Sequence, residues 1–78
     1  MNYNNYNKLT PQQHRHILEL YEHGYLYNAV GELLGALQDG QITVDYIFRV
    51  LTELGYSREE ITITAMQHHR RHEQEELR

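Results

Sequence analysis

The sequence predicts an all-α protein: a small four-helix domain with a three-helix core and a long C-terminal helix. Apolar residues recur three and four positions apart, which is the spacing of one face of an α-helix. Good N-capping residues precede three of the predicted helices, and glycine ends three of them. The segment Ile61-Thr62-Ile63-Thr64 alternates like a strand, but the sequence offers no second strand to pair with it, so we predict a helix there too.

The first helix is predicted over residues 11–23. Thr10 can cap it, and Pro11 suits its first position because the N–H that proline lacks would be unpaired there. Gln13 stands where the second partner of a capping box belongs. Gly24 ends the helix, because glycine readily adopts the left-handed backbone conformation that follows many helices.

The second helix is predicted over residues 27–38 and is closed by Asp39-Gly40. Gly31 and Gly35 lie four residues apart inside it, and each costs up to about 1 kcal/mol relative to alanine in a helix. Glycine at this spacing indicates either that another helix approaches closely or that the second helix stops early.

The third helix is predicted between Thr43, which can cap it, and Gly55, which ends it. Ser57 and Glu60 then form a capping box, because each side chain can satisfy the other's backbone donor. The fourth helix is predicted over residues 58–77, a length of about 30 Å. Its second half is almost wholly polar, so we expect it to project from the core or to lie on a partner.

The domain is predicted to span residues 9–66, between a flexible arm of residues 1–8 and a polar helical extension of residues 67–78. The arm is rich in asparagine and tyrosine and lacks helical periodicity. The predicted core consists of Ile17, Leu20, Tyr21, Val30, Leu33, Leu34, Leu37, Ile47, Phe48, Leu51, Leu54, Ile61 and Met66.

Length and composition set limits on function. The 78 residues are enough for one domain, and without cysteine the chain has neither a disulfide nor a thiolate metal site. Because so small a core favours self-association, a homodimer is one expectation. The formal net charge of −4 argues against binding nucleic acid mainly by bulk electrostatics. No apolar run suits a signal peptide or a membrane span, so we expect a cytoplasmic protein without a membrane partner.

The sequence contains no catalytic motif, and we expect neither enzyme activity nor a cofactor. Its single serine, Ser57, is accounted for by capping, and no nucleophile elbow or Gly-rich phosphate loop is present. His68 and His72 lie four residues apart, on one face of a helix, where two imidazoles can chelate a divalent metal. Because a zinc site needs three or four ligands, we favour a His-rich polar face over a metal site.

Four segments match a pattern shared by DNA-binding regulators. They are residues 9–13, 17–25, 30–35 and 43–47. Gly31 and Gly35 occupy the places of a small residue and a glycine that shape a tight turn, and Thr43-Val44 matches the pair that opens a recognition helix. In these features the chain resembles the trihelical helix-turn-helix of sigma-factor-type and resolvase-type regulators.

The resemblance covers residues 9–54 and implies a three-helix core. It also implies a dimer that binds DNA through Thr43, Tyr46 and Arg49. The link of residues 36–42 is about three residues longer than in the family. Arg49 is the single cation of the candidate recognition face, and Asp45 lies on the same face.

We therefore favour a small non-enzymatic regulatory or inhibitory protein that acts by protein–protein interaction; a helix-turn-helix transcriptional regulator is the alternative. Small, acidic, cysteine-free helical chains are common among phage and mobile-element modulators of host machinery, which suggests such an origin by analogy. Tyrosine and arginine are favoured at interface hot spots. The predicted protein-binding residues are Tyr25, Tyr27, Tyr46, His68, His69, Arg70, Arg71 and His72.

Overall fold

A computed structural model of the chain describes residues 8–76, with side chains as far as residue 71. It contains four helices: α1 (Pro11–Glu22), α2 (Leu26–Gln38), α3 (Val44–Glu53) and α4 (Arg58–Glu76). These residues form no strand, and the prediction of an all-α four-helix domain is confirmed. Of the helices in this part of the chain, none is both long enough and apolar enough to cross a membrane.

The predicted capping boxes fix where two helices begin. The Thr10 hydroxyl accepts from the Gln13 backbone N–H at 3.1 Å, and the Gln13 side chain accepts from the Thr10 N–H at 2.9 Å. Ser57 and Glu60 make the same two bonds at the start of α4, at 3.1 and 2.9 Å. Each box satisfies two backbone donors that the first turn of a helix leaves unpaired.

Gly24 illustrates how the first three helices end. Its backbone has a φ of 78°, which glycine adopts at little cost. This conformation turns the chain so that the Tyr25 N–H donates to the Leu20 carbonyl at 2.8 Å. The Gly24 N–H donates to the Tyr21 carbonyl at 3.0 Å. This pair of bonds is the Schellman motif, which recurs at the ends of α2 and α3.

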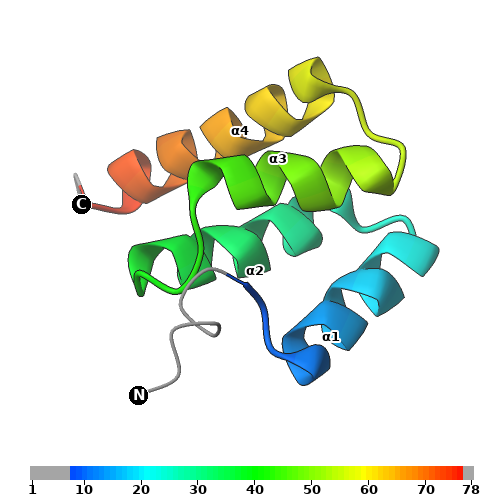
Figure 1. The fold of residues 1–78 in the computed structure, drawn as a ribbon. Helices are drawn as coiled ribbons and strands as arrows, with labels where there is room; N and C mark the ends of the chain where they lie inside the picture. The colour runs from blue at the N-terminus through cyan, green and yellow to red at the C-terminus, as the bar shows by residue number, and fades with distance from the viewer. Residues whose placement is uncertain (1–7, 77–78) are drawn as a thin grey trace.

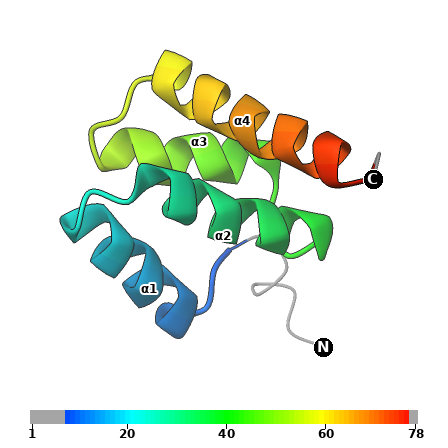
Figure 2. The same cartoon turned by 180° about the vertical axis from the view of Figure 1, so that it is seen from behind.

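The second helix is the centre of the bundle. It packs against α1, α3 and α4, and α4 also packs against α3. Figures 1 and 2 show α2 between α1 and α4. The link from α1 to α2 and the link from α3 to α4 lie at the same end of the bundle, and the C-terminal half of α4 runs toward the other end.

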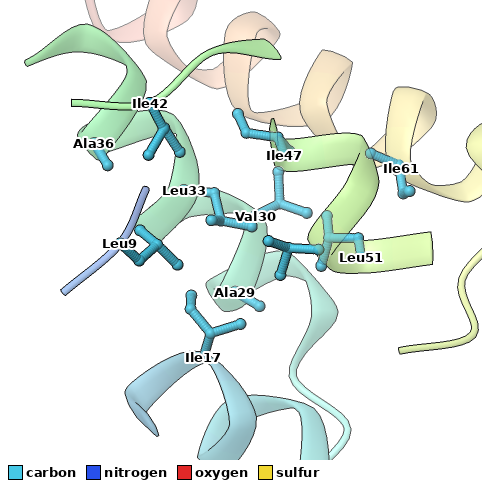
Figure 3. Packing of buried hydrophobic residues seen from close by; sticks show 11 residues of the cluster. Leu9, Ile17, Ala29, Val30, Leu33, Ala36, Ile42, Ile47, Leu51 and Ile61 are labelled. Atoms are coloured by element: carbon cyan, nitrogen blue, oxygen red, sulfur yellow. The ribbon is translucent and has the colours of Figure 1, made fainter. Parts of the chain in front are cut away.

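The core is built from side chains of all four helices, of the segment before α1 and of the link between α2 and α3 (Figure 3). Its buried hydrophobic members are Leu9, Ile17, Ala29, Val30, Leu33, Ala36, Ile42, Ile47, Val50, Leu51 and Ile61. Leu9 precedes α1 and Ile42 precedes α3, so helical periodicity does not identify them. Ala29 and Ala36 are small, and they let neighbouring helices approach α2 closely.

Most of the predicted core is confirmed, with two exceptions. Tyr21 is 39% exposed and Met66 is 56% exposed, so placing them in the core was wrong. Tyr21 lies near the end of α1, where its ring packs edge to face with the partly buried Tyr56. Met66 lies on the side of α4 that faces away from α2 and α3, opposite Ile61.

The burial of α4 gives a matched test of its helical register. Ile61 is 1% exposed and Ile63 is 51% exposed, although both would share one face of a strand. Ile61→Val should lower the free energy of unfolding by about 0.5–1.5 kcal/mol, because it removes a buried methylene group. Ile63→Val should change it by less than about 0.5 kcal/mol. Urea denaturation measures both, and equal losses would contradict the register.

Candidate functional site

The inner side of α4 fixes how this helix lies on the bundle. Ile61 and Thr64 are buried and His68 is half-buried, at spacings of three and four residues that place them on one helix face. The Thr64 hydroxyl donates to the Glu60 carbonyl at 2.7 Å, so its burial leaves no unpaired donor. The buried stripe therefore continues beyond Met66, the predicted boundary of the core domain, as far as His68.

His68 is held against the first turns of α2. Its ring stacks on the Tyr27 ring, with centroids 3.8 Å apart and an interplanar angle of 12°. Its Nε2 lies 2.6 Å from the Tyr27 carbonyl oxygen. Because a carbonyl can only accept, Nε2 carries the proton and donates this bond. His68 and Tyr27, both predicted to bind a partner, thus contact each other.

Gly31 makes room for the His68 ring. A Cβ atom at position 31 would lie 2.8 Å from His68 Cε1 and 3.3 Å from Nε2, whereas a Cβ at Gly35 would meet nothing within 4 Å. The prediction that glycine in this helix admits a second helix is confirmed at Gly31, where that helix is α4. Gly35 has no such neighbour, and α2 continues past it to Gln38.

A shallow hollow lies beside this contact. It is lined by Tyr27, Gln67, Arg70 and Arg71. His69 and both arginines are exposed, and the two arginines give this part of α4 its positive charge. The side chain of His72, predicted to bind a partner or a metal, lies outside the described residues.

Four ring-bearing residues form a second surface, which we call the aromatic end: Tyr21, His23, Tyr25 and Tyr56. The Tyr21 and Tyr56 rings meet edge to face with centroids 5.9 Å apart, and the His23 and Tyr25 rings stack at 5.8 Å. Tyr25 is 53% exposed. Burial raises the pKa of the Tyr56 hydroxyl, and Tyr21 and Glu60 add to the rise, so Tyr56 stays neutral at physiological pH.

The predicted DNA-facing residues have different surroundings. The Thr43 hydroxyl accepts from the Tyr46 N–H at 3.2 Å and so caps α3. The Tyr46 hydroxyl accepts from the Leu9 N–H at 3.0 Å, which ties α3 to the segment before α1. Arg49 is exposed on α3, as are Asp45 and two further polar residues, Thr52 and Glu53.

The side of α4 that faces away from the bundle carries a third surface, which we call the outer face: Glu59, Ile63, Met66 and Arg70. All four are exposed. They follow one another at intervals of four, three and four residues. We predicted Arg70 as a binding residue but not Glu59, Ile63 or Met66, and Met66 was assigned to the core.

No metal centre emerges from the described side chains, which contain no group of three or more histidine, aspartate or glutamate residues that could hold an ion. His68 Nε2 is already bonded to the Tyr27 carbonyl. On α1, His16 Nε2 lies 3.6 Å from Glu32 Oε1, and His16 Nδ1 lies 3.9 Å from Glu19 Oε1. All three side chains are at least half exposed. Pairs this exposed contribute little to stability.

No family model, curated protein or solved structure matches this chain. The helix-turn-helix resemblance stays a prediction.

The contact of His68 with Gly31 predicts opposite effects of alanine at the two α2 glycines. Gly35→Ala should raise the free energy of unfolding by about 0.5–1 kcal/mol, because alanine is the better helix former and meets nothing. Gly31→Ala should lower it by about 1 kcal/mol, because the new methyl group displaces the His68 ring from Tyr27. Thermal or urea unfolding provides the measurement.

His68→Ala supplies the control for this pair. In that background the clash is absent, so Gly31→Ala should become stabilising, as Gly35→Ala is. A Gly31→Ala variant that is stabilised in the otherwise unchanged protein would show that the His68 ring does not occupy this space.

Proposed function

We propose that this chain is a non-enzymatic regulatory or inhibitory protein of the cytoplasm that acts by binding another protein. The observation that supports it best is the exposure of large side chains at the aromatic end, where Tyr25 is 53% exposed and Tyr21 is 39% exposed. Tyrosine is enriched at interface hot spots because it buries a large apolar ring and keeps a polar hydroxyl.

The aromatic end is held in place, which favours binding. Tyr56 supports the Tyr21 ring from the side, and His23 stacks against Tyr25. Tyr25 is also tied through its backbone N–H to the Leu20 carbonyl. A partner therefore meets rings that have already lost much of their freedom, so less conformational entropy is lost on binding.

The first turn of α2 extends this surface toward α4. Tyr25 occupies the N-cap position of α2 without a side-chain capping bond. Tyr27 follows two residues later and lines the hollow with Gln67, Arg70 and Arg71. The proposed contact thus combines exposed tyrosines with a neighbouring positive charge. A protein that presents an apolar pocket with an acidic rim fits both features.

DNA is the less favoured partner. On the exposed side of α3, Arg49 is accompanied by Asp45 and Glu53. Phosphate contacts require several cations on the docking surface, and carboxylates there are repelled. Tyr46, which the resemblance assigns to DNA, has its hydroxyl bonded to the Leu9 backbone.

The proposal predicts that binding depends on Tyr25. Full-length protein is immobilised, and a partner is captured from the native host with and without nuclease. Tyr25→Ala should weaken the purified partner's affinity at least about tenfold, or about 1.4 kcal/mol. Val44→Ala is the matched control, because Val44 is 53% exposed as well but lies on α3. Calorimetry gives the two dissociation constants.

Two results would contradict the proposal. One is a partner that is lost on nuclease treatment, together with salt-sensitive DNA binding that Arg49→Glu abolishes. The other is a partner that both alanine variants bind as well as the unchanged protein does. Point variants are preferable to removal of residues 67–78, because truncation also removes His68 and its contacts with α2.

A further inference from the structure

The outer face of α4 pairs opposite charges and apolar groups in a symmetric order. Along the helix the order is Glu59, Ile63, Met66, Arg70, with two apolar residues at the centre and one charge of each sign at the ends. Ile63 is 51% exposed and Met66 is 56% exposed. Intervals of four, three and four residues are those of a two-helix seam, in which they keep the contacting side chains on one line.

The symmetry of this order decides which helix would fit the outer face. If a second α4 lies antiparallel, with the twofold axis between residues 64 and 65, Ile63 meets the partner's Met66. Glu59 then meets the partner's Arg70, and the axis repeats both contacts. A parallel arrangement places Glu59 against its own copy and Arg70 against its own copy, which brings like charges together.

We propose that the outer face binds a second copy of this chain, α4 against α4 and antiparallel, to give a twofold dimer. Such an interface is self-complementary, as twofold symmetry requires. Figures 1 and 2 show α4 at the edge of the bundle with no other described element beyond it, so a neighbouring helix has access. The dimer does not use the aromatic end, although its Arg70 also borders the hollow beside Tyr27.

The size of the seam indicates a weak, concentration-dependent dimer. From Glu59 to Arg70 it spans about three helical turns, or roughly 16 Å. Small interfaces belong to weak and transient contacts, so we expect a dissociation constant between about 10 μM and about 1 mM. Pairing covers Ile63 and Met66, which the folded monomer leaves in water.

Charge reversal tests the proposal because the two end charges meet only across the dimer. In analytical ultracentrifugation of the full chain, Glu59→Arg and Arg70→Glu should each weaken self-association at least about tenfold, since each creates two repulsive pairs. Mixing the two single variants in equal amounts should restore a dimer, because every changed charge then faces its opposite. The double variant Glu59→Arg/Arg70→Glu should dimerise as the unchanged protein does.

Arg49→Glu is the matched control. It makes the same charge change at an exposed position on α3 and should leave self-association unaltered. Circular dichroism of each variant checks that the helices remain folded. A chain that stays monomeric up to about 1 mM would overturn the proposal. A dimer that Arg70→Glu leaves intact would overturn it too, because another surface would then form the contact. Tyr25→Ala should leave the dimer unchanged.

Discussion

The contact of His68 with Tyr27 and Gly31 determines how the second half of α4 lies on the bundle. Between Thr64 and residue 71, the last whose side chain the structure describes, α4 has no large apolar side chain among its inner residues, so burial of hydrocarbon cannot hold it there. An aromatic stack and one hydrogen bond to a backbone carbonyl take over this role. Both need a close approach of the two helices, which only the missing side chain at Gly31 permits.

This constraint also orients the surfaces available for binding. Once His68 faces α2, the helical period directs Ile63, Met66 and Arg70 to the opposite side. Tyr27, on which His68 stacks, belongs to the first turn of α2. The same contact therefore stabilises the start of that helix beside Tyr25. The proposed dimer face and the proposed partner surface thus depend on one packing contact, and Arg70 borders both of them.

Local chemistry made much of the fold predictable. Capping boxes act between residues three positions apart, and Gly24 turns the chain within one motif, so the helix ends could be inferred from short segments. Contacts between residues far apart in the sequence could not be inferred in this way. The Tyr46 hydroxyl bonds to the Leu9 N–H across 37 positions, and periodicity alone offers no signal for that bond. The exposure of Tyr21 was missed because α1 packs against α2 alone among the helices.

The candidate site was predictable only in part, for the same reason. The sequence named tyrosines and arginines as candidate binding residues, but it could not separate half-buried tyrosines, such as Tyr27 and Tyr46, from the exposed Tyr25. The spacing of the outer face was visible in the sequence. The burial of Ile61, Thr64 and His68 was not, and it is this burial that shows which side of α4 remains uncovered.

The most direct test of the central contact is a nuclear Overhauser measurement on the labelled protein at low concentration. The structure predicts cross-peaks between the His68 Hε1 proton and the Gly31 Hα protons, with a protonated Nε2 and ring-shifted Tyr27 resonances. His68 signals that match an exposed histidine, with no cross-peak to Gly31, would contradict the account of how α4 is held.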